Sequence, residues 1–267
     1  MKKFFCSLTV LFLISFLAGC EGSSKKSWKD IKAPELISQQ QLPENKTMTV
    51  GLNIYLFRIQ TDKLMELGEQ ISKTDTLPVT YNDFAAFSAN GLVACAGDRT
   101  SWQQIARLLS QSKPEIKKRI NLLITENLPD DIIIAESSGP VSFLYHWGST
   151  TAGIGFDTGR MLLRIKVEPL IGLLQSCKLN VTPVYKIGAA QKTKKWLVDS
   201  NSSEFAFEAA ALNACLQPGQ FVLLAPARTK TDQSESQTLA DLMFYSQNPQ
   251  KITSIYLIAC SLINSPP

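Results

Sequence analysis

Residues 48–59 read MTVGLNIYLFRI, and this stretch decides how the folded body begins. In an extended chain, alternate side chains point to opposite faces. Here both faces carry apolar side chains: Val50, Leu52, Ile54 and Leu56 on one, and Tyr55, Phe57 and Ile59 on the other. Strands that are apolar on both faces lie in the interior of a sheet. We therefore predict a central strand here.

The residues after this strand carry the apolar period of short helices. A side chain able to cap a helix precedes each apolar stretch: Thr61 before residues 62–71, Asp83 before residues 84–89, and Ser101 before residues 102–109. Gly91 is suited to end the second helix, and Pro114 prevents the third from continuing. Residues 92–96 return to an extended pattern. Residues 48–113 are thus predicted to form a small α+β unit in which helices cover one face of a short sheet.

Beyond residue 114 the pattern changes to strands separated by turn residues. The predicted strands are residues 120–124, 131–135, 141–147, 154–156, 161–168, 181–187, 195–199, 204–208, 221–225 and 252–263, with a short apolar segment at 239–245. Residues 161–168 alternate clearly, with Leu163, Ile165 and Val167 on one face and Arg164, Lys166 and Glu168 on the other. We predict an α+β fold in which the helix-covered unit is followed by a mainly antiparallel β region over 114–267. This region is either a second unit or continuous with the first.

Residues 1–20 have the features of an export signal. Lys2 and Lys3 precede an apolar run that is shorter than the roughly 20 residues of a membrane-spanning helix. The run ends in Leu-Ala-Gly-Cys at residues 17–20, which resembles the lipobox of bacterial lipoproteins. The resemblance implies cleavage after residue 19, a diacylglyceryl group on the Cys20 thiol, and acylation of the new amino terminus. The alternative is an ordinary signal peptide, residues 1–19, with a cysteine near its end.

The lipobox resemblance also implies a location. Glu21 follows the cysteine where inner-membrane lipoproteins carry aspartate, so the resemblance favours the outer membrane, with the body facing the periplasm. Residues 20–47 are predicted to be the lipidated cysteine and a flexible tether, because they are polar, rich in lysine and interrupted by Pro34 and Pro43. The tether lysines either contact anionic head groups or are solvated.

Charge and cysteine content exclude several classes of ligand. Loss of Lys2 and Lys3 with the signal lowers the net charge from +4 to +2, which predicts no nucleic-acid partner. Besides Cys6 and Cys20, the chain has Cys95, Cys177, Cys215 and Cys260. These four either pair as disulfides, in one of three ways, or are buried small apolar residues. No metal site or cofactor is predicted, because the cysteines are widely spaced and His146 is the single histidine.

One loop carries a possible catalytic motif. Asp157-Thr158-Gly159 resembles the active-site loop of aspartic peptidases, in which two aspartates share a proton. The chain has one copy, and Arg160 stands where that family carries serine or alanine. The alternative is a tight hairpin, in which Asp157 caps the turn and Gly159 takes a positive φ. We favour the hairpin and keep a hydrolase as the alternative function.

Other catalytic patterns are missing from the sequence. Gly148-Ser149 is not part of a nucleophile elbow, Gly153-Ile154-Gly155 lacks the third glycine of a dinucleotide site, and the carboxylates of Asp130, Asp131 and Glu115 show no catalytic spacing. His146, between Tyr145 and Trp147, reads as a half-buried structural residue. No catalytic residue is therefore assigned.

The last part of the chain has a recognisable layout. Residues 218–263 run through a Pro-Gly strand, a polar loop, a leucine-rich segment and a final β-branched strand, which is similar to the end of the outer-membrane secretin domain. That family's glycine-rich strand ending and Thr-Pro-Arg close are absent. The resemblance implies a place in a secretin-type assembly. The predicted function is a non-catalytic, membrane-anchored envelope lipoprotein that binds or scaffolds envelope proteins.

Overall fold

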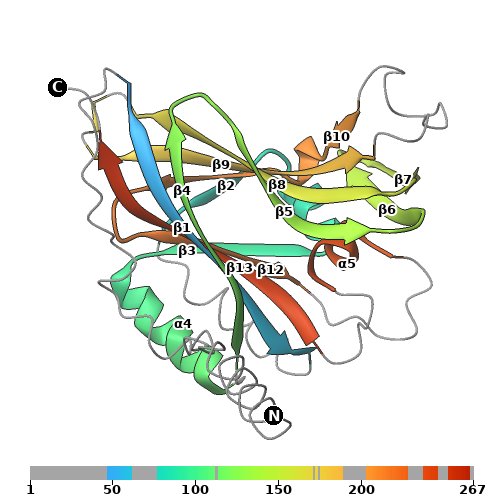
Figure 1. Cartoon of the computed structure of the whole chain (residues 1–267), viewed down its shortest axis with the longest axis horizontal. Helices are drawn as coiled ribbons and strands as arrows, with labels where there is room; N and C mark the ends of the chain where they lie inside the picture. Colours follow the sequence, from blue (N-terminus) through green and yellow to red (C-terminus); the bar gives the residue numbers. More distant parts are fainter. Residues whose placement is uncertain are drawn as a thin grey trace, which may run out of the picture.

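A computed structural model of the chain describes residues 47–61, 77–111, 114–170, 172–173, 175–188, 203–227, 237–245 and 252–264. The signal, Cys20, nearly all of the tether, the helix predicted at 62–71 and the strand predicted at 195–199 lie outside the described residues. Figure 1 draws the described strands and helices in sequence colours.

The described strands form two larger antiparallel sheets and a hairpin. In sheet A the order is β3 (Leu92–Gly97), β12 (Phe221–Pro226), β13 (Ile252–Asn264), β1 (Thr49–Gln60) and β4 (Glu115–Thr125). In sheet B the order is β2 (Val79–Tyr81), β11 (Leu212–Leu216), β9 (Cys177–Ile187), β8 (Gly159–Pro169) and β5 (Asp130–Ser137), with β10 (Glu204–Ala206) also paired with β9. The hairpin consists of β6 (Val141–Trp147) and β7 (Thr150–Phe156).

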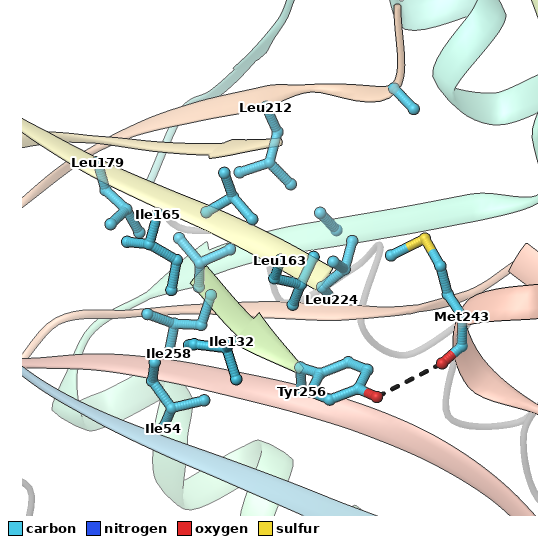
Figure 2. Packing of buried hydrophobic residues seen from close by; sticks show 14 of the residues in the cluster. Ile54, Ile132, Leu163, Ile165, Leu179, Leu212, Leu224, Met243, Tyr256 and Ile258 are labelled. Atoms are coloured by element: carbon cyan, nitrogen blue, oxygen red, sulfur yellow. Dashed lines mark hydrogen bonds between the residues drawn. The ribbon is translucent and has the colours of Figure 1, made fainter. Parts of the chain in front are cut away.

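The main core lies between sheets A and B. Figure 2 shows side chains of both sheets packed together, with Ile54 and Ile258 from sheet A near Ile165 and Leu179 from sheet B. Tyr256 belongs to the same core, and its hydroxyl donates a hydrogen bond to the Met243 carbonyl at 3.4 Å. Burial of these apolar faces provides the main force that holds the two sheets together.

A second core lies on the outer face of sheet A, where helix α4 (Arg99–Gln111) packs (Figure 1). Trp102, Ile105 and Leu109 of the helix contact the aromatic and aliphatic side chains that point away from sheet B. The helix begins at Arg99 rather than after Ser101. Its cap is Asp98, whose carboxylate accepts hydrogen bonds from the backbone N–H groups of Thr100 at 2.9 Å and Ser101 at 3.0 Å.

The remaining described helices are short. They are α3 (Phe84–Ala89), η4 (Glu208–Ala210) and α5 (Leu239–Phe244). Helix α3 begins after Asp83, as the sequence predicted, and its C-cap is Asn90, directly before Gly91. Helix α5 covers the leucine-rich segment before β13 and starts with a capping box between Thr238 and Asp241.

The predicted α+β class is wrong, whereas the central strand predicted at residues 48–59 is confirmed. The described chain is mostly β, and it contains no separate sheet covered by helices. Strands β1 and β3 do not pair with each other: β1 lies between β13 and β4, and β3 pairs with β12. Residues 48–113 and 114–267 thus contribute strands to the same sheet. Local periodicity identified the apolar faces, but the partners come from about 200 residues further along the chain.

Candidate functional site

The Asp157 loop connects β7 to β8, and the predicted hairpin is wrong, because β7 pairs with β6 and β8 pairs with β5 and β9. The Tyr185 hydroxyl donates a hydrogen bond to the Asp157 carbonyl at 2.6 Å, and the Gly188 N–H donates to the Thr158 carbonyl at 2.9 Å. A Cβ atom on Gly159 would lie 2.5 Å from the Lys186 carbonyl oxygen. The predicted positive φ at Gly159 is wrong, since this residue is not among the positive-φ glycines. Glycine is required there because the turn presses against β9.

The same loop lacks the second carboxylate of an aspartic peptidase site. Within the described part of the chain, no hydrogen bond joins the Asp157 carboxylate to another carboxyl group. The neighbouring Arg160 forms an exposed ion pair with Glu136, with 3.1 Å between Nε and Oε1. A proton shared between two aspartates therefore has no counterpart among the residues described at this turn.

His146 lies in β6, and its ring makes one hydrogen bond across the hairpin. Its Nδ1 lies 2.8 Å from the Thr151 hydroxyl. Its backbone N–H donates to the Asn90 side chain at 3.0 Å, and its carbonyl accepts from the same side chain at 2.8 Å. Ser149 lies in the exposed hairpin turn. These contacts give His146 a structural position.

Helix α3 and the β6–β7 hairpin are joined at both helix ends. The Asp83 carboxylate accepts from the Ala86 N–H through Oδ1 and from the Gly148 N–H through Oδ2, both at 2.9 Å. Asn90, at the other end, is fully buried and bonds to both His146 backbone groups. Each cap residue therefore also positions the hairpin, a role that the sequence did not reveal.

Aromatic side chains pack beneath the hairpin. They are Phe143, Tyr145, Phe156, Tyr185, Phe205 and Phe207. Burial raises the pKa of Tyr145 to about 12, although its hydroxyl accepts a hydrogen bond from the Ala209 N–H at 3.1 Å. These rings pack against one another in an apolar cluster, in which all but Phe205 are buried.

A charged network crosses the outer face of sheet B. Arg164 donates from Nε and Nη2 to the Asp131 carboxylate, at 2.8 and 2.9 Å. It also donates from Nη1 and Nη2 to the Glu204 carboxylate, at 2.7 and 2.9 Å. These hydrogen bonds lower the pKa of Glu204 and raise that of Arg164. The sequence placed Arg164 on a wet face, but it left Asp131 as an isolated carboxylate. Arg164 offsets the charge of only one of the two carboxylates, but its bonds tie β8 to β5 and β10.

Sheet A ends in an edge strand, β4, which pairs with β1 and with no other described strand. Its edge therefore offers backbone N–H and C=O groups to a further strand. The first half of β4 carries the exposed residues Lys117, Lys118 and Arg119, and a register shift opposite Leu56 and Phe57 makes a bulge at Lys117. Lysines and bulges of this kind protect an edge against pairing.

The second half of β4 lacks this protection. Between Ile120 and Thr125 the strand carries no charge, and Leu123 is 48% exposed beside the exposed Asn121. Leu128, in the connection to β5, is also exposed. We call Ile120–Thr125 the uncharged half of β4. Sequence analysis missed it, because edge position follows from pairing between distant strands.

All four cysteines are free thiols in the structure, with Cys95, Cys177 and Cys260 buried and Cys215 exposed. No group of three or more histidine, cysteine or acidic side chains within the described ranges could hold a metal ion. No helix among those residues combines the length and apolar character needed to cross a membrane. Cys20, the predicted lipidation site, lies outside the described residues.

No protein-family model matches the chain, and no curated protein matches it in sequence. Among solved structures, the chain is similar to the InvG secretin domain beta-barrel from the Salmonella SPI-1 injectisome NC-base, with 10% sequence identity and a TM-score of 0.20. The similarity covers 80% of this chain and 60% of the InvG chain. At this TM-score the two structures do not superpose as one fold, so the likeness supports no conclusion about function.

Proposed function

We propose that this chain is a non-catalytic lipoprotein of the bacterial cell envelope that binds an envelope protein and holds it at the membrane. Cys20 is the lipidated residue, residues 21–47 are the tether, and the body faces the periplasm from the outer membrane. The support for the anchor is Leu-Ala-Gly-Cys at residues 17–20, directly after a short apolar run. More than one acyl chain gives durable attachment, whereas one chain binds only marginally.

The observation that carries the binding role is the uncharged half of β4. A partner strand that adds to this edge gains backbone hydrogen bonds, and its side chains meet Asn121 and Leu123. The adjacent basic residues attract an acidic segment. Burial, together with the charges of Arg58 and Lys118, lowers the pKa of Lys117, so this end of the edge is already crowded with positive charge. The partner is therefore an extended protein segment that is apolar at one end and acidic at the other.

A place in a secretin-type assembly is the more specific form of this proposal. It rests on the layout of residues 218–263, in which β12, α5 and β13 follow one another as strand, leucine-rich segment and strand. The alternative, a hydrolase built on Asp157, is favoured by no contact at that turn.

The anchor is tested by labelling cells with a palmitate analogue. The wild-type chain should take up the label and Cys20→Ala should not, because the acyl acceptor has been removed. Cys6→Ala is the matched control, since Cys6 leaves with the signal, and it should keep the label. Label that persists in Cys20→Ala contradicts the anchor.

The binding edge is tested by crosslinking in cells, mild detergent extraction and native sizing. The double variant Asn121→Lys/Leu123→Lys places charge along the uncharged half and should lose the complex. Phe84→Lys is the control, because it adds the same charge at a 66% exposed side chain far from β4. Phe84 belongs to α3, which contacts β3, the edge strand of sheet A opposite β4. The wild-type complex should also weaken as ionic strength rises. A wild-type chain that is strictly monomeric, or a complex that the double variant leaves intact, overturns the proposed edge.

A further inference from the structure

Two buried cysteines come from facing sheets and lie in the same core. Cys177 is the first residue of β9 in sheet B, and Cys260 belongs to β13 in sheet A. Both side chains are 0% exposed, and both belong to the core between the two sheets. About 80 residues separate them in sequence. Their proximity is therefore a product of the fold rather than of the local chain.

The connection from β11 to β12 brings the two cysteines to one corner of the sandwich. Leu216, the last residue of β11, is paired with Cys177. Three residues later the chain has reached sheet A, where the Gly219 N–H donates to the Cys260 carbonyl and the Cys260 N–H donates to the Gln220 carbonyl, both at 2.8 Å. A connection this short brings the start of β9 close to the part of β13 that contains Cys260.

Side-chain contacts tighten the same corner. Gln217 Nε2 donates a hydrogen bond to the Ser176 hydroxyl at 3.1 Å, directly before Cys177. The Gln217 N–H also donates to the Gln220 side chain at 2.8 Å. Gly219 has a φ of 90°, which glycine adopts without strain. The corner is thus held from both sheets by hydrogen bonds on either side of the two cysteines.

The two thiols influence each other: Cys177, together with burial, raises the pKa of the Cys260 thiol. A raised pKa keeps the thiol protonated, and the thiolate is the form that reacts in thiol–disulfide exchange. Oxidation of the pair is therefore expected while the chain folds, before the core closes around both sulfur atoms.

The sheets separate the other two cysteines from this pair. Cys95 points to the outer face of sheet A, where it packs in the second core with Trp102 and Ile105. Cys215 is exposed on the outer face of sheet B, because its neighbours Ala214 and Leu216 point inward. A bond from either one to Cys177 or Cys260 would have to cross a sheet. Four cysteines can form two disulfides in three ways. The two ways that join Cys95 or Cys215 to Cys177 or Cys260 do not fit the fold.

We propose that Cys177 and Cys260 form a disulfide that links the two sheets at the β11–β12 corner. The two thiols lose two protons and two electrons as the S–S bond forms. The acceptor is the disulfide of an envelope dithiol oxidoreductase, which is reduced to two thiols. Formation in the cell rests on the proposed envelope location, because disulfides persist in that compartment.

The test uses the full-length chain isolated from cells in detergent. Free thiols are blocked with a maleimide under denaturing conditions, and the digest is mapped by mass spectrometry without reduction. We expect the Cys177 and Cys260 peptides to be joined and unlabelled, with Cys95 and Cys215 carrying the maleimide. The same digest reports whether Cys20 is lipidated.

The possible results of this experiment distinguish failure of the proposed disulfide from failure of the proposed envelope location. Labelled Cys177 and Cys260 in a chain with lipidated Cys20 overturn the disulfide and leave the proposed function standing. If both are labelled and Cys20 is unmodified, the location fails, and refolding the purified chain in a glutathione redox buffer decides the pairing. Appearance of the linked peptide there supports it, and two free thiols overturn it.

Variants provide a second readout. Reduction should lower the denaturation midpoint of the oxidised wild-type chain, because the disulfide restricts the unfolded state. The same decrease should appear in Cys95→Ala/Cys215→Ala and be absent in Cys177→Ala/Cys260→Ala. If the second variant does not fold, the peptide map of the wild-type chain still decides the question. A midpoint that does not respond to reduction in the wild-type chain contradicts the proposal.

Discussion

Sheets A and B share one core but differ on their outer faces. Along β13 of sheet A, neighbouring residues such as Leu257 and Ile258 are both fully buried, one toward α4 and the other toward sheet B. Along β9 of sheet B, Leu179 is fully buried, whereas its neighbour Lys178 is partly exposed. Sheet A is a middle layer and sheet B an outer layer.

This difference explains where each sheet keeps its polar groups. Sheet B has a solvent-facing side, where Arg164, Asp131 and Glu204 form a network that no other layer of the described residues covers. The middle of sheet A has no such face, and the exposed charged residues Lys117, Lys118 and Arg119 lie on its edge strand β4. A surface for partners is therefore expected along an edge of sheet A rather than on its face.

The largest expected loss of stability follows from substitutions in β13, which is buried on both faces. Leu257→Ala and Ile258→Ala should each lower the free energy of unfolding by about 2–5 kcal/mol, because each leaves a cavity in a different core. In sheet B, Leu179→Ala should cost as much, but Lys178→Ala should cost less than about 0.5 kcal/mol. Urea denaturation of the four variants measures this. A small loss at Leu257 would mean that the outer face of sheet A is not a true core.

A smaller effect is expected where the backbone of sheet B is packed most tightly. Gly159→Ala should lower the free energy of unfolding by about 1–3 kcal/mol, because the added carbon would meet the Lys186 carbonyl and the Tyr185 ring. Gly153→Ala, in β7, is the control, since no atom lies within 4 Å of its added carbon. Thermal unfolding compares them. Equal stability of the two variants would show that the turn relaxes freely.

The sequence predicted strand faces well and strand partners poorly. The alternation of Leu163, Ile165 and Val167 is a local property, and β8 buries these three residues as predicted. The pairing of β1 with β13 depends on residues about 200 positions apart, which no local period encodes. Strand β11 was missed, although Leu212, Ala214 and Leu216 alternate with Asn213 and Cys215. The signal there is short and its apolar side chains are small.

The same limit applies to the candidate sites. Asp83 was identified as a residue that precedes a helix, which is local chemistry, but its bond to the hairpin and that of Asn90 were not foreseen. The partner of Asp131 lies 33 residues away in Arg164, and the uncharged half of β4 becomes an edge only after the sheet has formed. Lipidation of Cys20 stays a prediction from sequence alone.

A pH-dependent effect is expected at the sheet B network. The pKa of Glu204 is lowered, chiefly by hydrogen bonds from Arg164, so its ionised form stabilises the fold above the unfolded pKa of about 4.3. That stability is lost as pH falls through the lower folded pKa. Arg164→Met should reduce stability at pH 7 by about 1 kcal/mol and flatten the decline between about pH 5 and pH 3.

Lys166→Met is the matched control for this network. Lys166 lies on the same strand and face and makes a single 2.9 Å bond to Glu168. Its replacement should have a smaller effect at pH 7, because Lys178 also lies near that carboxylate. Denaturation series at several pH values measure both variants. An unchanged pH profile in Arg164→Met would mean that the network does not stabilise the wet face.

The smallest effect is expected at Asp157, the first residue of the peptidase-like motif at residues 157–159. Asp157→Asn should change the free energy of unfolding by no more than about 0.5 kcal/mol, because Tyr185 bonds to the backbone carbonyl of this residue, which the substitution keeps. Burial raises the pKa of Tyr185 and the charge of Asp157 adds to that rise, so the variant should bring the tyrosine pKa closer to its usual value. Spectroscopic titration measures this shift, and the crosslinking assay checks that the envelope complex persists. A folded variant that loses its cellular role while still forming the complex would direct attention back to hydrolysis, because only the carboxylate would have changed.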